Sequence, residues 1–501
     1  MICVTIARET NDELRRSWEM AARAGAGLAE IRLDYLTEPL DWKGLLRDKP
    51  TPVLVTVRRT IDGGRWSGDE SSRRALIIEA TENGTDWVDI EVDIAHHLPR
   101  TGISRRIISF HDMMATPCNL DEITQRCRDG DADLIKLAVM GHSLNDALNL
   151  LGSVARSHAK SPTMGLSMGD WGQFTRVVNA RFGQSWTYAA FDSSSSPAPG
   201  MITHSDLVGI YGYNRICAST KLFGVIGDPV HHSKSPLVHN LAFRHHDLDM
   251  VYVPIRISAG DLDGFIRRMR DWGFYGLSVT IPHKESVIEL LDEVDSLVAL
   301  TGSCNTVLAG VAEGGRLEGF NTDLAAALGS LSEAVGGGPQ ALSGKQVLLI
   351  GAGGVARSLA YGLSRAGAEV VITNRTFSRA LDLCTEVGSG VRVVAWADRE
   401  GVARESAIIV NATSVGMSPN LEYSPLDGNS MHSRQVVFDT IYTPEWTKLL
   451  SDARTAGATT LSGVGMFVRQ AVAQSELFTG GLVAPSGTMS ESLRTSLKKA
   501  V

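Results

Sequence analysis

The run Asp133-Leu-Ile-Lys-Leu-Ala-Val-Met140 places one lysine, Lys136, in the middle of an apolar segment. Such a nearly continuous apolar run is typical of a parallel strand that is buried on both faces. Burial disfavours the charged form of a lysine, and a neutral lysine amine can attack a ketone to form a Schiff base. The alternative is a structural lysine that reaches solvent or pairs with a carboxylate. The segments around Lys136 have to decide between these two interpretations.

Further apolar segments occur on both sides of this run, and most are separated by helix-like stretches such as 12–24 and 120–128. The expected strands are 2–7, 28–36, 52–58, 86–93, 106–112, 133–140, 163–169 and 186–191. Alternation of this kind predicts parallel strands joined by crossover helices, and eight such units predict an α/β fold of the (β/α)8 barrel type. An open doubly wound sheet is the alternative, but the first half of the chain lacks a glycine-rich nucleotide turn.

Composition narrows the class of protein. The 501 residues are 43% hydrophobic and 21% charged, with a net charge of −8 and no long basic run, so neither nucleic acid nor an anionic membrane is indicated as a partner. No segment is long and apolar enough to span a membrane, and the first residues lack the apolar region of a signal peptide. The six cysteines show no CxxC motif and no metal-ligand spacing, which predicts reduced thiols, a cytoplasmic location and no bound metal.

Polar residues cluster where the expected barrel strands end. They are Glu30 and Arg32, Arg58, His111, Lys136, and Arg176 after the seventh strand. Chemistry in such barrels lies at the carboxyl ends of the strands. Each residue alone is most simply a structural ion-pair partner. Three arginines, a histidine and a lysine converging on one face favour instead a site for an anionic substrate, such as a carboxylate held by a guanidinium fork.

The segments 30–34 (EIRLD), 57–58 (VR), 108–112 (ISFHD) and 133–140 (DLIKLAVM), followed by an arginine, resemble type I 3-dehydroquinate dehydratase over roughly residues 1–215. The resemblance implies that Lys136 forms an imine with the C3 ketone of 3-dehydroquinate. It implies that His111 is the general base, a task suited to a histidine whose pKa lies near working pH. The substrate-binding residues that it implies are Glu30, Arg32, Arg58, Asp62 and Arg176.

Two departures from this family concern substrate contacts. Asp62 stands where family members usually have glutamate. The substrate-covering loop, usually Ser-Ala-Pro-Gly-Gln, reads Pro197-Ala-Pro-Gly-Met201 here, so both of its expected polar contacts are missing. We expect weaker loop closure and substrate affinity without loss of the imine chemistry. The serine run 193–196 offers a replacement hydroxyl in a shifted register.

The second half contains a nucleotide-binding motif. A strand at 346–350 is followed by the turn Gly351-Ala-Gly-Gly-Val-Ala356, a helix and a second strand at 369–373. This GxGxxG/A motif in a strand-turn-helix setting predicts a dinucleotide site, although a tightly packed βα turn is the alternative. NAD enzymes usually carry an acidic residue after the second strand, whereas this chain has Asn374-Arg375-Thr376 and then Arg379. Two arginines without an acidic residue can bind the 2′-phosphate of NADP, so the sequence predicts NADP. The alternative is that these arginines are ordinary surface residues.

Motifs on both sides of that turn together resemble shikimate dehydrogenase across nearly all of residues 219–501. They are 228–236, 276–284, 302–306, 319–323, 411–417 and 463–470. The resemblance implies a catalytic pair, Lys284 and Asp323, with Lys284 as proton donor. Implied substrate contacts are Ser233, Ser235, Thr280, Asn305, Tyr442 and Gln470. Implied cofactor contacts are Gly351, Ala352, Gly353, Gly354, Val355, Ala356, Asn374, Arg375, Thr376, Arg379, Thr413, Ser414, Gly463 and Met466.

The two resemblances predict a bifunctional enzyme of the shikimate pathway that dehydrates 3-dehydroquinate and reduces the 3-dehydroshikimate formed to shikimate with NADPH. The expected domains are a barrel (1–217), a substrate-binding domain (218–325) and a Rossmann domain (326–501) whose last helices, from about 465, return toward the substrate domain. The partners are therefore small molecules. Two alternatives remain: a quinate/shikimate dehydrogenase with an impaired dehydratase half, and a non-catalytic metabolite sensor on the same folds.

Overall fold

The computed structural model describes residues 1–192, 197–310 and 315–498, without the side chain of Pro339. The chain forms two compact units. The first comprises Met1–Pro236 and Asp249–Phe265, and the second comprises Leu237–Leu248 and Ile266–Val501. The three domain boundaries expected from the sequence stay a prediction. None of the helices in the described residues is long and apolar enough to cross a membrane.

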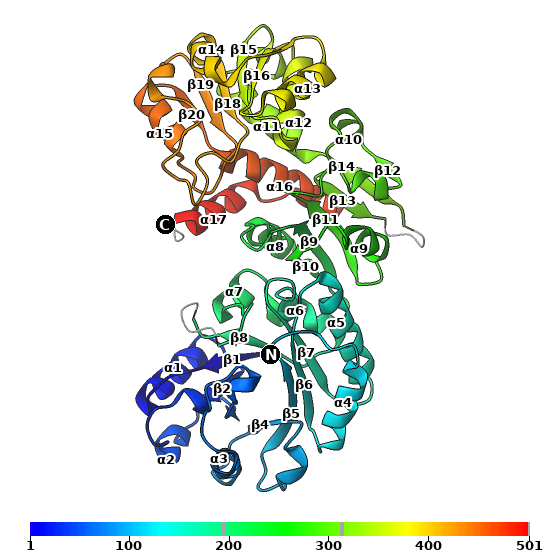
Figure 1. The fold of residues 1–501 in the computed structure, drawn as a ribbon, viewed down its shortest axis with the longest axis vertical. Coiled ribbons are helices and arrows are strands. Elements are labelled where there is room, and N and C mark those ends of the chain that lie inside the picture. Colours follow the sequence, from blue (N-terminus) through cyan, green and yellow to red (C-terminus); the bar gives the residue numbers. More distant parts are fainter. Residues whose placement is uncertain (193–196, 311–314, 499–501) are drawn as a thin grey trace. The chain divides into compact units, whose positions relative to one another are not determined.

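The first unit contains the predicted barrel sheet (Figure 1). Its strands are β1 (Ile2–Ile6), β2 (Leu28–Arg32), β3 (Val53–Thr56), β4 (Trp87–Glu91), β5 (Arg105–Asp112), β6 (Leu134–Met140), β7 (Thr163–Met168) and β8 (Thr187–Ala190). All ladders between them are parallel, in the order β7-β6-β5-β4-β3-β2-β1-β8. Between β7 and β8 no ladder is present in the described part of the chain. There the N–H of Gly165 donates to the side-chain Oε1 of Gln184 at 3.0 Å.

Helices cover the outside of this sheet (Figure 1). They are α1 (Asn11–Arg23), α2 (Trp42–Leu46), α3 (Glu70–Glu82), α4 (Leu120–Asp129), α5 (Leu144–His158), α6 (Thr175–Val178) and α7 (His204–Gly209). Side-chain caps set several of their starts, because a hydroxyl or carboxylate can accept from the otherwise unpaired first N–H groups. Thr10 caps α1, Asp69 caps α3, and Ser143 with Asp146 forms a capping box at α5. The predicted barrel fold is confirmed.

Alternation along the strands gives the barrel interior an apolar layer and then a polar layer. The apolar layer consists of Cys3, Leu28, Leu54, Ile107, Leu134, Met164, Leu166, Trp186 and Tyr188. Successive side chains of a strand point to opposite faces, so a residue two positions further along points inward again. In five strands that position is polar, occupied by Thr5, Glu30, Thr56, Ser109 and Lys136. The strands therefore bring these polar groups together nearer their carboxyl ends.

After the barrel, β9 (Lys221–Gly227) and β10 (Met250–Arg256) pair in parallel within the first unit. In the second unit β11 (Phe274–Val279) pairs antiparallel with β13 (Thr306–Ala309), which continues to β14 (Leu317–Phe320) and β12 (Glu293–Val294). The helices of this region are α8 (Ser235–His245), α9 (Leu262–Arg268) and α10 (Ser296–Thr301). The turn after β11 lies beside the start of β13, since the Cys304 N–H donates to the Lys284 carbonyl at 2.8 Å.

The remaining sheet is parallel and has the order β17-β16-β15-β18-β19-β20, which is the 3-2-1-4-5-6 order of a Rossmann fold. Its strands are β15 (Gln346–Ile350), β16 (Glu369–Thr373), β17 (Val391–Val393), β18 (Ile408–Asn411), β19 (Val436–Asp439) and β20 (Thr459–Leu461). Its helices are α11 (Thr322–Ala334), α12 (Gly354–Arg365), α13 (Phe377–Val387), α14 (Arg399–Glu405) and α15 (Lys448–Thr455). The last helices, α16 (Gly463–Thr479) and α17 (Ser486–Lys498), share a buried apolar cluster with Val238 and Ala242 of α8.

Candidate active sites

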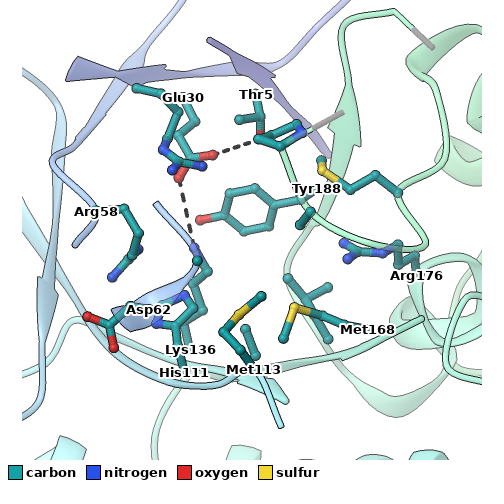
Figure 2. Close-up of a pocket in the computed structure, with 17 residues that line it drawn as sticks. Thr5, Glu30, Arg58, Asp62, His111, Met113, Lys136, Met168, Arg176 and Tyr188 are labelled. Atoms are coloured by element: carbon teal, nitrogen blue, oxygen red, sulfur yellow. Dashed lines mark hydrogen bonds and ion pairs between the residues drawn. The ribbon is translucent and has the colours of Figure 1, made fainter. Parts of the chain in front are cut away.

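Lys136 of β6 lies at the base of a pocket at the carboxyl ends of the barrel strands (Figure 2). The residue is 5% exposed. Its Nζ is 3.0 Å from Oδ2 of Asp89 and 3.8 Å from Oε1 of Glu30, and it lies 4.3 Å from the centre of the Tyr188 ring. The lysine is therefore buried, as the Schiff-base interpretation expects. It is also paired with carboxylates, as the structural interpretation expects. The carboxylates compensate for its lost hydration.

Asp89 of β4 connects this lysine to an arginine. Its Oδ1 is 2.8 Å from Nη2 of Arg58, and the hydroxyl of Ser109 donates to the same oxygen at 2.5 Å. Burial opposes ionisation of Asp89, but the charges of Arg58 and Lys136 outweigh it and hold the pKa of Asp89 well below its usual value. Asp89 is a site residue that the sequence reasoning missed. The signal was present, since Asp89 and Glu91 interrupt an otherwise apolar strand at alternate positions.

His111 ends β5 and lines the same pocket. Its Nδ1 is buried and has no hydrogen-bond partner in the described part of the chain. Burial, followed by the charges of Arg58 and Lys136, lowers the pKa of His111 well below 6.5. This differs from the expectation of a pKa near working pH, because two cations share the pocket with the imidazole. The ring is therefore neutral at pH 7 and can accept a proton.

The three predicted arginines line the pocket but differ in their partners. Arg32 donates to both oxygens of Asp34 at 2.8 and 2.7 Å. Arg58 pairs with Asp89 and also with Glu91, at 2.7 Å. The Arg176 side chain is 2% exposed and forms no ion pair or hydrogen bond with any described residue. Burial alone lowers the pKa of Arg176 to about 10, so it remains a cation at neutral pH. Arg176 is the pocket's uncompensated positive charge.

Asp62 (Figure 2) and the segment 197–201 also line the pocket. Asp62 pairs with the neighbouring Arg59 at 2.6 Å. Pro197, Ala198 and Met201 line the pocket, whereas the serine run 193–196 lies outside the described residues. The cavity between these residues has a volume of about 60 Å³.

The second unit carries the predicted dehydrogenase pair. Nζ of Lys284, in the turn after β11, donates to Oδ2 of Asp323 at 2.6 Å. Asp323 lies in the first turn of α11, which Asn321 caps. Both side chains keep some exposure, so a substrate can reach them. The geometry joins a cation to a carboxylate as an acid–base pair.

The other predicted substrate residues differ in their contacts. The Asn305 amide donates to Thr322 Oγ1 at 2.9 Å and accepts from the Thr322 N–H at 2.9 Å, so it supports the start of α11. Gln470 donates to the carbonyl of Phe467, and the Tyr442 ring lies 4.7 Å from the Phe467 ring. Thr280 is half-buried at the end of β11. Ser233 and Ser235 belong to the first unit, and their assignment to this site stays a prediction.

The turn between β15 and α12 has the backbone that a pyrophosphate needs. Gly351 has φ +123°, and a Cβ there would lie 2.9 Å from the carbonyl oxygen of Ala412. Gly353 is the N-cap of α12 and provides no side-chain cap, while a Cβ at Gly353 or Gly354 would meet open space. The first N–H groups of α12 are therefore available to an anion. At Gly463 a Cβ would lie 2.4 Å from the Thr440 carbonyl oxygen, so α16 starts in close backbone contact.

The residues after β16 fit a 2′-phosphate. Asn374 donates to the carbonyl of Thr376 at 2.9 Å, while Arg375, Thr376 and Arg379 are exposed. Position 374 carries asparagine where NAD enzymes usually carry an acidic residue, so no negative charge there repels a phosphate. Of the other predicted contacts, Ala352, Val355, Ala356 and Met466 belong to one apolar cluster, and Thr413 and Ser414 follow β18. Thr413 is oriented by Asn411, whose Oδ1 accepts from both its N–H and its hydroxyl.

Together, these features are those expected of one class of protein: a lyase joined in one chain to an NADP-dependent oxidoreductase. Known proteins agree in both halves. The type I 3-dehydroquinase family matches residues 2–216, the shikimate dehydrogenase substrate binding domain matches 225–307, and the shikimate / quinate 5-dehydrogenase family matches 334–427. A bifunctional 3-dehydroquinate dehydratase/shikimate dehydrogenase of Arabidopsis thaliana, named as chloroplastic, is 37% identical over 97% of this chain and 83% of its own length.

The chain therefore belongs to the family of bifunctional 3-dehydroquinate dehydratase/shikimate dehydrogenases of the shikimate pathway. It is a lyase and an oxidoreductase that uses NADP, as the sequence predicted.

Relatives that cover the second half alone are also similar. The NADP(+) shikimate dehydrogenase of Methanopyrus kandleri is 42% identical over 56% of this chain and 97% of its own. A crystal structure of a shikimate dehydrogenase in complex with NADP+ superimposes with a TM-score of 0.52 at 33% identity, covering 56% of this chain and 97% of its own. A quinate dehydrogenase from Corynebacterium glutamicum in complex with NAD gives 0.51 at 30% identity, covering 55% of this chain and 99% of its own.

Proposed function

We propose that Lys136 forms the imine with the C3 ketone of 3-dehydroquinate, and that His111 then removes the C2 proton. The protonated imine withdraws electrons from the neighbouring carbon and makes that proton acidic. His111, now protonated, assists loss of the C1 hydroxyl as water, and hydrolysis of the imine releases 3-dehydroshikimate. The observation that carries the proposal is the placement of a buried lysine and a neutral histidine with an unpartnered Nδ1 in one pocket.

Within this site, Arg176 binds the substrate carboxylate. An uncompensated buried guanidinium is strongly unfavourable, and an incoming carboxylate supplies the missing counter-charge. Arg32 is already neutralised by Asp34, and Arg58 by Asp89 and Glu91, so these two arginines contact substrate hydroxyls rather than bind the carboxylate. Asp62 contributes a further polar contact in the pocket.

Borohydride reduction in the presence of 3-dehydroquinate tests the proposal, because it converts the imine to a stable secondary amine. Peptide mass spectrometry is expected to find the adduct on Lys136. A Lys234→Ala variant is the control, since Lys234 is absent from the pocket lining and its loss should leave the adduct unchanged. Absence of an adduct, or an adduct on another lysine, contradicts the assignment.

For the second reaction, Lys284 donates a proton to the developing alkoxide at the carbonyl of 3-dehydroshikimate, and Asp323 orients Lys284 and the substrate hydroxyl. NADPH supplies the hydride when bound. The first N–H groups of α12 would hold the pyrophosphate of the cofactor, and Arg375 with Arg379 would hold its 2′-phosphate. Ser233 and Ser235 with Thr280, Asn305, Tyr442 and Gln470 hold the substrate. The domains are bounded at 217/218 and 325/326.

Quinate is the second candidate substrate of the dehydrogenase half. The likeness to a quinate dehydrogenase and to the shikimate / quinate 5-dehydrogenase family supports it. Ser235 and Thr280 match the pattern expected for shikimate, and we propose shikimate as the preferred substrate. The ratio of kcat/KM for shikimate and quinate tests this preference. The partners are these small molecules, and a cytoplasmic location is supported by six free cysteines.

A further inference from the structure

Tyr188 of β8 has a buried hydroxyl that nothing in the described part of the protein satisfies. The residue is 3% exposed and lines the dehydratase pocket. Its hydroxyl oxygen is buried and has no hydrogen-bond partner. A buried hydroxyl without a partner is unfavourable and uncommon in native structures, so this one calls for an explanation.

The hydroxyl points into the side of the pocket that holds Glu30 and Lys136 (Figure 2). The ring of Tyr188 lies 4.3 Å from Nζ of Lys136, which is the atom that forms the imine. Tyr188 is therefore close to whatever part of the substrate neighbours the new carbon–nitrogen bond. A cation above the face of an aromatic ring is attracted to it, and this applies to the ammonium and to the protonated imine alike.

The covering loop leaves a need for such a donor. Pro197 and Met201 line the pocket, and neither side chain can donate a hydrogen bond. Another hydroxyl of the lining, Thr5 Oγ1, already donates to Glu30 at 2.7 Å. Lys136 and Arg176 carry the covalent bond and the positive charge for the carboxylate. The Tyr188 hydroxyl is thus an uncommitted neutral donor in the pocket wall.

We propose that Tyr188 is a substrate-binding residue of the dehydratase, whose hydroxyl donates to the substrate hydroxyl on the carbon next to the imine carbon. This inference rests on the imine at Lys136 proposed above. The donor role holds over the working pH range, because burial and the charge of Glu30 raise the pKa of Tyr188 well above 10 and keep the phenol protonated. The free enzyme retains the unsatisfied hydroxyl because the substrate satisfies it.

The test compares Tyr188→Phe with Tyr213→Phe in the full chain. Tyr213 is a matched control: it is a buried tyrosine of the same unit, absent from the pocket lining, and its hydroxyl donates to Asn179 Oδ1 at 2.8 Å. In Tyr188→Phe, kcat/KM for 3-dehydroquinate is expected to fall about tenfold, chiefly through KM. Its unfolding temperature should stay equal or rise, since an unpaired buried hydroxyl is removed. Tyr213→Phe should show the reverse: a lower unfolding temperature and unchanged kinetics.

Unchanged dehydratase kinetics in Tyr188→Phe overturn the inference. So does a fall in kcat/KM that comes with a lower unfolding temperature, because the hydroxyl is then structural. Borohydride trapping separates this from the proposed function. An adduct on Lys136 in both the parent and Tyr188→Phe supports the proposed imine, whatever the kinetics of the variant. Absence of an adduct in the parent refutes the imine itself.

Discussion

At the scale of single residues, the arginines of the dehydratase pocket are defined by what they pair with. Arg58 is held between Asp89 and Glu91, whereas Arg176 has no acidic partner among the described residues. Removing one member of a buried ion pair is costly because the other charge is left without compensation. Removing a buried charge that has no partner should instead raise the free energy of unfolding, because the cost of burying that charge disappears. The same substitution at these two sites should therefore have different consequences.

We expect Arg176→Gln to raise KM for 3-dehydroquinate about a hundredfold, the effect of losing a charge-assisted contact. Its unfolding temperature should not fall. Arg58→Gln should lose about 3 kcal/mol of stability, because Asp89 and Glu91 lose their shared cation. Steady-state kinetics and thermal unfolding of both variants check this. A destabilised Arg176→Gln variant would show that Arg176 has a structural role.

The pH dependence of the dehydratase should reflect His111. Its neutral form is the proposed base, and its pKa lies well below 6.5 because of burial and the nearby cations. Protonation therefore removes activity only at lower pH, so kcat/KM should stay flat as pH falls to 6.5 and decline below it. Dehydrogenase activity measured on the same samples monitors whether the protein stays folded. An acid limb centred at or above pH 6.5 would be inconsistent with a base of depressed pKa.

At the scale of secondary-structure elements, β4 shows how a strand assembles the site. Asp89 and Glu91 occupy alternate positions, so both face inward and meet cations from the segment after β3, from β6 and from α3. The neighbouring Val88 and Ile90 face away and are buried against the helical layer. Strand alternation thus serves packing on one face and the network of charges on the other.

The βα turn at Gly351 is the element that we propose binds the cofactor. Gly351→Ala puts a Cβ at φ +123° and 2.9 Å from the Ala412 carbonyl oxygen, so the turn must move. We expect KM for NADPH to rise at least about tenfold, with dehydratase activity unchanged. Gly401→Ala in α14 is the matched control, because a Cβ there meets nothing within 4 Å and helical glycine is unfavourable. Equal NADPH kinetics in both variants would contradict the role of this turn.

At the scale of the whole molecule, the lysine of each reaction lies in a different compact unit. Lys136 and its partners Asp89, Glu30 and Tyr188 all belong to the first unit, and Lys284 with Asp323 belongs to the second. The chemistry at one lysine therefore needs no group from the network around the other.

Single-site variants test this independence. Lys136→Ala should abolish dehydration of 3-dehydroquinate but reduce added 3-dehydroshikimate at the parent rate. Lys284→Ala should convert 3-dehydroquinate to 3-dehydroshikimate and stop there. Absorbance assays of each half-reaction measure both, and each variant is the control for the other. Loss of both activities in either variant, with the fold retained by circular dichroism, would disprove independence.

The sequence by itself determined the architecture and most of the chemistry. Alternating apolar segments specify the barrel strands, because burial on both faces of a parallel sheet requires them. The turn 351–356 and Arg375 predict the Rossmann half and NADP, because a glycine-rich turn suits a pyrophosphate and an arginine suits a 2′-phosphate. Tertiary structure decided the rest. That Asp89 supports Lys136, that Arg176 alone of the pocket's three predicted arginines lacks an acid, and that the Tyr188 hydroxyl is unsatisfied depend on which strands are neighbours. Partners so far apart along the chain are set by register and burial, which no local pattern records.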